Sequence, residues 1–170
     1  MISNEKNILL IGMMGCGKST IGKILAEKIS YRFVDMDNYI EEIAGQTIPE
    51  LFKKGEENFR DWETESCSRL SKKNSTVISA GGGIIKRDIN MKLLNENSII
   101  IFIDRPIEHI LDDIDVSKRP LLNNGKEVLY KLKEERYDLY NKYCDFKVAN
   151  DGTIEDVINK IIDITESVSL

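Results

Sequence analysis

Gly12-Met13-Met14-Gly15-Cys16-Gly17-Lys18-Ser19, residues 12–19, matches the pattern G-x-x-x-x-G-K-[ST] of a phosphate-binding loop. Its glycines let backbone N–H groups curl around an anion without interference from side chains. Lys18 supplies a positive charge for the outer phosphates of a nucleotide, and the Ser19 hydroxyl is suited to bind Mg²⁺. The stretch therefore predicts a nucleotide site.

The segments on either side of this loop match the context that the motif requires. Residues 7–11 form a short apolar run that is typical of a buried parallel strand. After the loop, Ile21, Ile24, Leu25 and Ile29 have the spacing of one helix face. Such a helix turns the positive end of its dipole toward the phosphates. The order of strand, loop and helix favours a phosphate site over a glycine-rich turn that binds nothing.

Length and composition limit the class of protein. The chain has 170 residues, so we expect residues 1–170 to form one domain with a substantial core. The net charge of −5 argues against broad nucleic-acid binding. No apolar run approaches membrane-spanning length, and no signal peptide pattern is visible. Cys16, Cys67 and Cys144 fit no zinc pattern and are odd in number, which predicts a reduced, cytoplasmic protein.

Apolar, strand-like runs alternate with helical segments along the chain. We expect strands at residues 7–11, 32–35, 76–79, 98–104 and 146–149. This alternation predicts an α/β fold, a three-layer αβα sandwich in which a five-stranded parallel sheet is covered on both faces.

Several helix boundaries carry their own signals. Thr47 begins a capping box, and Gly55 is suited to close that short helix. Pro106 fits the first turn of a helix that runs to about Ile114. A last helix is expected to open at Thr153.

Residues 112–125 interrupt the alternation. This stretch has little periodicity and contains proline and glycine. Loops of this length in compact domains are often lids, so we expect a mobile lid here.

Asp35 and Asp37 stand at the end of the second expected strand, where alternation directs both carboxylates to one side. Ligands bind at such strand ends in open α/β sheets. One acid could hold Mg²⁺ through water, and the other could accept a proton from a substrate hydroxyl. A solvated turn with a helix N-cap is an equal alternative.

Other candidate residues are cations and glycines. Arg60 and Glu63 lie three apart on an expected helix, so their pairing could orient the guanidinium to grip a carboxylate, although a surface ion pair explains the spacing as well. Residues 81–83 are three glycines after the third strand, which suits close backbone approach to a ligand or a flexible turn. Arg119 and Arg136 could bind anions or be solvated surface charges.

Taken in order, these segments resemble the shikimate kinase family over essentially the whole chain. The resemblance rests on the loop through Thr20, residues 33–37, Phe59-Arg60 with Glu63, Gly81-Gly82-Gly83, residues 119–122, and Glu135-Arg136 followed by Tyr140. It implies a P-loop fold of the nucleoside-monophosphate-kinase type. It also implies phosphorylation of the shikimate 3-hydroxyl by ATP, giving shikimate 3-phosphate and ADP in chorismate and aromatic amino-acid biosynthesis.

The resemblance assigns roles to individual residues. A helical region at about residues 37–63 would bind shikimate, and the shikimate ligands would be Asp37, Arg60, Gly82 and Arg136. Mg²⁺ would be bound by Ser19, with Asp35 orienting its waters. The nucleotide would be held by Gly15, Cys16, Gly17, Lys18, Ser19, Thr20, Arg119 and Thr153. The catalytic residues would be Lys18, Asp37 and Arg119.

The chain departs from the family pattern at one place. Many relatives carry an arginine near the start of the lid that stacks on adenine, whereas residues 112–115 here read Asp-Asp-Ile-Asp. The alternative function is another small-molecule kinase of the same fold, a gluconate or nucleotide kinase, which should not need Arg60, Gly82 and Arg136 together. In either case we expect a monomer with small-molecule substrates and no nucleic-acid or membrane partner.

Overall fold

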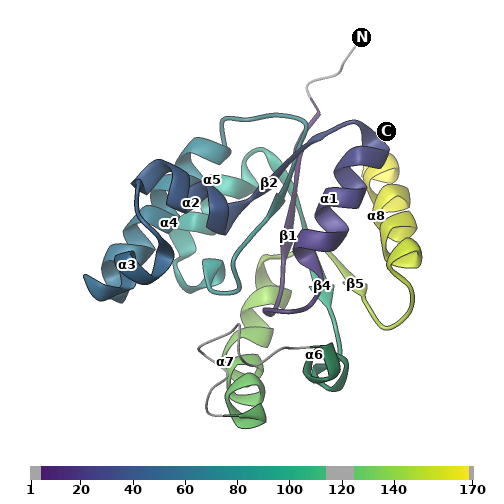
Figure 1. The fold of residues 1–170 in the computed structure, drawn as a ribbon. Helices are drawn as coiled ribbons and strands as arrows, with labels where there is room; N and C mark the ends of the chain where they lie inside the picture. Colours follow the sequence, from purple (N-terminus) through teal and green to yellow (C-terminus); the bar gives the residue numbers. More distant parts are fainter. Residues whose placement is uncertain (1–4, 114–124, 169–170) are drawn as a thin grey trace.

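Five parallel strands form a single sheet in the computed structural model, which describes residues 5–113 and 125–168 (Figure 1). The strands are β1 (Asn7–Ile11), β2 (Arg32–Asp35), β3 (Thr76–Ser79), β4 (Ser98–Asp104) and β5 (Phe146–Ala149). Their order across the sheet is β2-β3-β1-β4-β5, and every neighbouring pair is parallel. All five have the bounds that the sequence predicts.

Helices fill the connections between the strands. They are α1 (Lys18–Ile29), α2 (Met36–Ala44), α3 (Ile48–Lys53), α4 (Glu56–Leu70), α5 (Asp88–Asn95), α6 (Ile107–Asp113), α7 (Lys126–Tyr143) and α8 (Ile154–Val168), with a short 3-10 turn η1 (Ile84–Lys86). In the described ranges, none of these helices is both long enough and apolar enough to cross a membrane.

The helices form two layers, one on each face of the sheet. α1 and α8 contact each other on one face, while α5 and α7 contact β4 from the other (Figure 1). The chain crosses from β1 to β2 in one direction and from β3 through β4 to β5 in the opposite direction. Because such crossovers are right-handed, α1 lies on one face and α5 and α7 lie on the other. α8 follows the last strand and packs beside α1. The predicted αβα fold is therefore confirmed.

The core is centred on β1, the middle strand. All five residues of β1 are buried, and Leu9 lies between Ile78 of β3 and Ile100 of β4. A parallel strand covered on both faces needs a continuous apolar run rather than an alternating one, which is why residues 8–11 are all aliphatic. The position of β1 fixes the phosphate loop at the centre of the sheet edge.

The expected helix boundaries are present, with two differences. Thr47 forms a complete capping box with Glu50. Gly55 lies one residue beyond the C-cap of α3 and also serves as the N-cap of α4, so it joins the two helices. α6 begins one residue after Pro106, and its predicted end at Ile114 lies outside the described residues, as does most of the predicted lid.

Asn7 is the polar exception in β1 and ties three segments together. Its side chain is fully buried, its Nδ2 donates to the Lys73 carbonyl at 2.7 Å, and its Oδ1 accepts from the Thr76 N–H at 3.2 Å. The amide thereby satisfies buried backbone groups at the end of α4 and the start of β3.

Replacement of this amide tests the role. In Asn7→Ala the Thr76 N–H loses its side-chain acceptor, and the Lys73 carbonyl keeps only the donor from Asn97, so the free energy of unfolding is expected to fall by about 1–3 kcal/mol. Urea denaturation measures the change. Asn159→Ala, at an exposed position of α8, is the control and should leave stability nearly unchanged. Equal stability of the two variants would contradict this role.

Candidate active site

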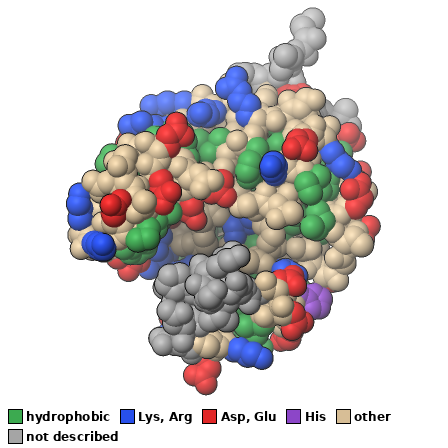
Figure 2. All heavy atoms as spheres, viewed as in Figure 1, with side chains coloured by type: hydrophobic (Ala, Val, Ile, Leu, Met, Phe, Trp, Pro, Cys, Tyr) green, Lys and Arg blue, Asp and Glu red, His purple; other side chains and the backbone are tan. Residues whose placement is uncertain are grey.

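A cavity of about 490 Å³ opens at the carboxyl ends of the strands. The residues that line it are Met14, Gly15, Gly17, Lys18, Ser19, Thr20, Asp35, Asp37, Asn38, Ser79, Ala80, Gly81, Gly82 and Arg105. They follow the ends of β1, β2, β3 and β4, the edge where open α/β sheets bind ligands. On the face shown in Figure 2, Lys and Arg side chains lie inside a hollow at the middle of the molecule.

The phosphate loop is fixed by close backbone contacts. Gly12 has φ 146°, and a Cβ there would lie 2.6 Å from the carbonyl oxygen of Ile103 in β4, so only glycine fits. From the β5 side, the buried side chain of Asn150 donates from Nδ2 to the Cys16 carbonyl at 2.9 Å. The loop is thus held between the ends of β4 and β5 before α1 begins at Lys18.

Lys18 is folded back against the loop that precedes it. Its side chain is buried, and its ammonium donates to the carbonyls of Gly12 at 2.7 Å and Met13 at 2.8 Å. The Cys16 thiol is buried 3.5 Å from the same ammonium. These contacts keep a positive charge at the loop, next to the N-terminus of α1, where an anion is favoured.

Ser19, Asp35 and Ser79 form a cluster of oxygen ligands. The Ser19 hydroxyl donates to Asp35 Oδ2 at 2.7 Å and lies 3.0 Å from the Ser79 hydroxyl. The other Asp35 oxygen caps α2 by accepting from the N–H groups of Asp37 at 3.0 Å and Asn38 at 3.3 Å. Hydroxyl and carboxylate oxygens suit Mg²⁺, which binds through one or two carboxylates and keeps several waters. The donor set therefore fits the metal that the sequence predicts.

Arg60 and Glu63 form a buried ion pair on α4 rather than a surface one. Arg60 Nη1 donates to both Glu63 oxygens, at 2.7 and 3.1 Å, and Glu63 is only 2% exposed. On the other side, Glu56 accepts from Arg60 Nε and Nη2, and Lys86 donates to Glu56 at 2.7 Å. The guanidinium is therefore locked in one orientation.

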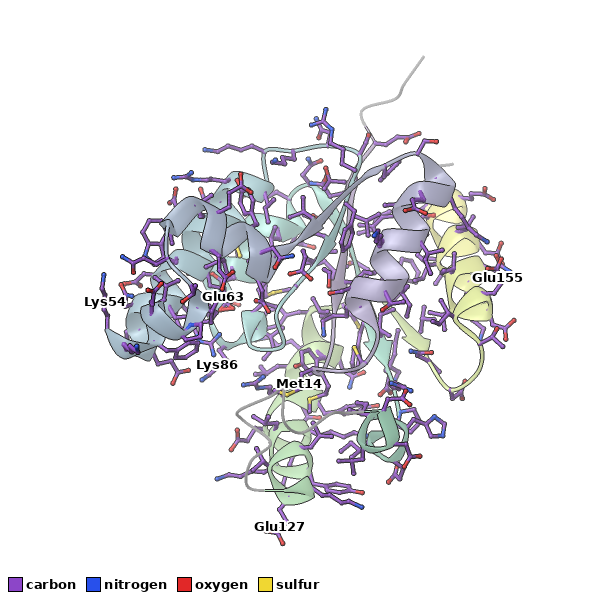
Figure 3. The ribbon with its side chains drawn as sticks, in the orientation of Figure 1. Met14, Lys54, Glu63, Lys86, Glu127 and Glu155 are labelled. Carbon is purple, nitrogen blue, oxygen red and sulfur yellow. The ribbon has the colours of Figure 1, made fainter. Side chains whose placement is uncertain are left out.

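Burial and nearby charges compete at Glu63. Burial raises the pKa of the Glu63 carboxyl above its ordinary value, the nearby Asp37 charge adds to this, and the Arg60 and Arg136 guanidinium groups oppose it. These influences link side chains from α2, α4 and α7 in one electrostatic cluster. Figure 3 shows Glu63 on the α4 side of the molecule and Met14 on the phosphate-loop side.

The three glycines after β3 bring their backbone against these charged groups. A Cβ on Gly83 would lie 2.6 Å from Arg60 Nη1, and one on Gly82 would lie 3.3 Å from Arg136 Nη1. A Cβ on Gly81 would lie 3.1 Å from Asp37 Oδ1. A Cβ would be crowded most at Gly83, and all three positions bring backbone close to charged side chains, so the segment is more than a flexible turn.

Tyr140 of α7 holds this glycine segment in place. Burial raises the pKa of Tyr140 to about 12, so its phenol stays protonated at neutral pH. The hydroxyl donates to the Gly82 carbonyl at 2.6 Å. The same helix carries Arg136, so α7 supplies both an anchor for the glycine backbone and a cation beside it.

The structure brings most of the predicted site residues to one cavity or its immediate surroundings. The predicted shikimate ligands lie together next to the phosphate loop. The side chains of Asp37, Arg60 and Arg136 lie against the glycine segment, residues 81–83, which includes Gly82. Thr153 lies apart, where its hydroxyl accepts from the Asp156 N–H at 3.1 Å at the start of α8, so its nucleotide role stays a prediction. Arg119 lies outside the described residues.

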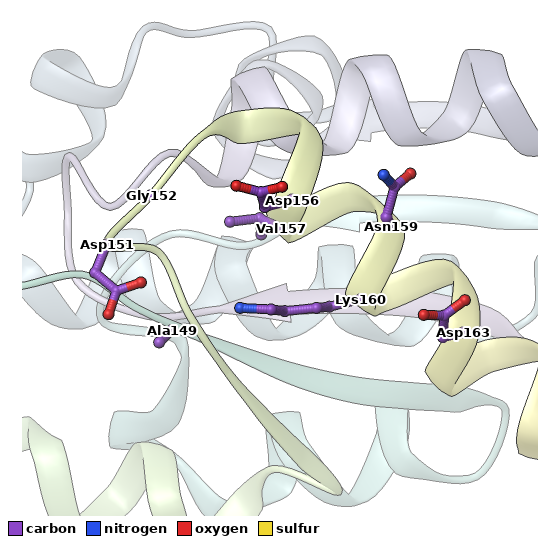
Figure 4. A pocket seen from close by; sticks show the side chains of 8 residues that line it. All are labelled: Ala149, Asp151, Gly152, Asp156, Val157, Asn159, Lys160 and Asp163. Carbon is purple, nitrogen blue, oxygen red and sulfur yellow. The ribbon is translucent and has the colours of Figure 1, made fainter.

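A second hollow, of about 310 Å³, lies beside α8 and has a different charge (Figure 4). Among the described residues that line it, Asp151, Asp156 and Asp163 are acids and Lys160 is the cation. Three carboxylates disfavour a polyphosphate. The larger cavity at the phosphate loop is therefore the better nucleotide site.

Sequence reasoning gave no role to three residues that the structure brings to the phosphate loop. Ser79 is the last residue of β3, while Arg105 and Asn150 directly follow β4 and β5. The shared signal was a polar residue at a strand end, because all parallel strands end at the same edge of the sheet. Asp35, at the end of β2, carries the same signal.

Comparisons with known proteins agree with this geometry. A family model described as shikimate kinase matches residues 14–166. A shikimate kinase from Clostridium botulinum (strain Alaska E43 / Type E3) is 53% identical over 157 residues, covering 92% of this chain and 95% of the relative. The chain belongs to the shikimate kinase family. A shikimate kinase from Clostridium beijerinckii is 49% identical over 160 residues, covering 94% of this chain and 95% of the relative.

A solved structure of the shikimate kinase family has the same fold. The shikimate kinase from Acinetobacter baumannii in complex with shikimate superposes with a TM-score of 0.90 at 34% sequence identity. The match covers 98% of this chain and 96% of that chain. The family resemblance and the nucleoside-monophosphate-kinase type of fold expected from the sequence are both confirmed.

A methyl group added to Gly83 tests the packing of the glycine segment. Gly83→Ala is expected to push the Arg60 guanidinium away from Glu63 and to lower the free energy of unfolding by about 1–3 kcal/mol. Chemical denaturation measures this. Gly152→Ala is the matched control, because a Cβ at Gly152 would lie 3.4 Å from Asp156 Oδ2, an ordinary contact. If both variants unfold alike, the packing role of Gly83 is wrong.

Proposed function

We propose that this cavity transfers the γ-phosphoryl group of ATP to the 3-hydroxyl of shikimate. Membership of the shikimate kinase family supports the reaction. The observation that supports the site is the buried Arg60–Glu63 pair, packed against the glycine segment beside a phosphate-binding loop. A gluconate or nucleotide kinase should not need Arg60, Gly82 and Arg136 together, and membership of the family favours shikimate as the acceptor.

The phosphate loop binds the nucleotide in this proposal. The N–H groups of residues 15–20 surround the phosphates, and Lys18 faces the charge that develops during transfer. The buried position of Lys18 supports this role, since a buried cation attracts an anion more strongly than a solvated one. Arg119 and Thr153 are kept as further nucleotide contacts on the family resemblance alone.

Ser19 and Asp35 hold the magnesium ion in this proposal, Ser19 directly and Asp35 through water. When bound, the ion neutralises part of the charge on the transferring phosphoryl group. The hydrogen bond between Ser19 and Asp35 supports the assignment, because it joins the two proposed oxygen ligands. Ser19 lies at the start of α1, and Asp35 is the last residue of β2. Ser79, 3.0 Å from the Ser19 hydroxyl, positions that hydroxyl from β3.

The acceptor is bound by groups that match its chemistry. Shikimate carries a carboxylate and several hydroxyls, so Arg60 and Arg136 bind the carboxylate by charged hydrogen bonds. The Gly82 backbone lies against the acceptor at the closest approach. Asp37 then orients the 3-hydroxyl and accepts its proton as the hydroxyl oxygen attacks the γ-phosphorus and ADP leaves. The arrangement is supported by the closeness of Asp37 to the glycine segment, since a Cβ on Gly81 would lie 3.1 Å from Asp37 Oδ1.

Phosphoryl transfer needs accurate positioning more than covalent help from the protein. The proposed machinery supplies this with short, buried contacts, such as the 2.7 Å bond from Arg60 to Glu63.

We propose that the enzyme acts as a monomer in the cytoplasm. The free state of all three cysteines is compatible with a reducing compartment.

An acceptor assay tests the proposed reaction. ADP release should require shikimate and should not occur with gluconate or nucleoside monophosphates. Arg60→Ala should raise the KM for shikimate more than about tenfold, because a charged hydrogen bond is lost, while Lys18→Ala should mainly lower kcat. Arg69→Ala, which removes an exposed arginine from the same helix, is the control. Turnover with a different acceptor alone would refute the assignment.

The buried Glu63 gives shikimate binding a pH dependence. Because burial raises the pKa of this carboxyl, it takes up a proton at a higher pH than an exposed glutamate does. Protonation removes the charge that holds Arg60, so the KM for shikimate is expected to rise as the pH falls. In Glu63→Gln the KM should be high and should change less over the same range. Identical pH profiles of KM in the two proteins would contradict this explanation.

A further inference from the structure

Arg105 is a cation at the phosphate loop for which neither the motif nor the proposed mechanism has a role. It directly follows β4, and its Nη1 donates to the Gly15 carbonyl at 3.1 Å. Its Nη2 pairs with Asp113 at the end of α6. The side chain lines the same cavity as Lys18 and Ser19. Arg105 is therefore within the nucleotide half of the site while remaining attached to the loop.

The charges that line the cavity indicate why a second cation is useful at the position of Arg105. Among the described residues that line the cavity, the cations are Lys18 and Arg105, and the acids are Asp35 and Asp37. Lys18 is already bonded to the carbonyls of Gly12 and Met13. A nucleotide brings several negative charges into this small space, next to two carboxylates. A second cation at the loop offsets that repulsion.

The pairing with Asp113 leaves Arg105 available for a ligand. The side chain of Asp113 is 64% exposed and that of Arg105 is 20% exposed. Ion pairs with a solvated partner contribute little, so a phosphate can replace Asp113 at small cost. A guanidinium also has five N–H donors in a planar fork, so it can hold the Gly15 carbonyl and a phosphate oxygen at once.

The sheet order indicates which substrate Arg105 faces. Asp37 and Gly82 follow β2 and β3, on one side of the central β1. Arg136 is on α7, which follows β4, but its guanidinium lies against Gly82. Arg105 follows β4 on the other side of β1, and it contacts the phosphate loop at the Gly15 carbonyl. This is the side from which the remainder of a nucleotide must enter, because the acceptor occupies the opposite half.

We propose that Arg105 is a nucleotide-binding residue whose guanidinium contacts the phosphate chain of ATP and ADP from the β4 side. The inference rests on the proposed function only for the identity of the nucleotide, since it concerns the phosphate loop and not the acceptor. It predicts that removal of the positive charge weakens nucleotide binding while the KM for shikimate at saturating ATP stays unchanged.

Titration calorimetry with ADP tests the inference on the full chain. Arg105→Gln is expected to raise the Kd for ADP by about tenfold or more, the loss typical of a charge-assisted hydrogen bond. The Kd of Arg105→Lys for ADP should lie between those of the parent protein and Arg105→Gln. Binding of ADP to the parent protein should also weaken more steeply with added salt than binding to Arg105→Gln, because a charge contact is screened. A Kd for Arg105→Gln within about twofold of the parent value overturns the proposal.

A second variant separates ligand binding from a merely structural role. Asp113→Asn breaks the same ion pair but keeps the guanidinium, so it should bind ADP at least as tightly as the parent protein. If Asp113→Asn and Arg105→Gln weaken ADP binding equally, the ion pair matters and the phosphate contact is refuted. ADP binding needs no acceptor, so a failure of shikimate turnover in the parent protein would refute the proposed function and leave this test intact.

Discussion

The contact between the backbones of Gly12 and Ile103 sets the geometry of the whole site. At this point the phosphate loop leaves β1 and lies directly on β4, with no room for a side chain between them. This contact fixes where Lys18 and the N-terminus of α1 stand relative to the other strand ends. The side chain of Asn150 adds a second attachment from β5 through the Cys16 carbonyl. A loop held from two strands presents its N–H groups without further ordering when an anion binds.

The Arg60–Glu63 pair shows a different balance between stability and function. Burying two charges has a desolvation cost that their attraction does not reliably offset, so such a pair is weak grounds for stability. Here the pKa of Glu63 is raised despite the guanidinium beside it, which indicates that the desolvation effect prevails. The outcome is a guanidinium held in one orientation by Glu63 and Glu56, against the backbone of Gly83. We interpret the desolvation of this pair as the cost of holding Arg60 ready to bind the acceptor carboxylate in the proposed mechanism.

The sequence predicted the strands and their parallel arrangement, because the central strands β1, β3 and β4 are buried, mostly apolar runs and helical segments alternate with all five strands. The site was predictable where residues form a spacing motif, as with Lys18 and Ser19, or share a helix face, as with Arg60 and Glu63. Local spacing could not reveal contacts between segments distant in the chain. Arg105 meets Gly15, and Tyr140 meets Gly82, only because the sheet order brings their elements together.

The same sheet order explains how a chain of net charge −5 can bind two anions. Each half of the sheet edge receives its own cation from elements that follow different strands: Arg60 lies on α4 after β2, and Arg105 follows β4, with Lys18 between them. Because these cations come from separate elements, each can be paired with its own acid, Glu63 or Asp113. The acid paired with Arg60 is buried, whereas the acid paired with Arg105 is exposed. In the proposed mechanism the acceptor clamp is therefore rigid, while the nucleotide side exchanges a carboxylate for a phosphate.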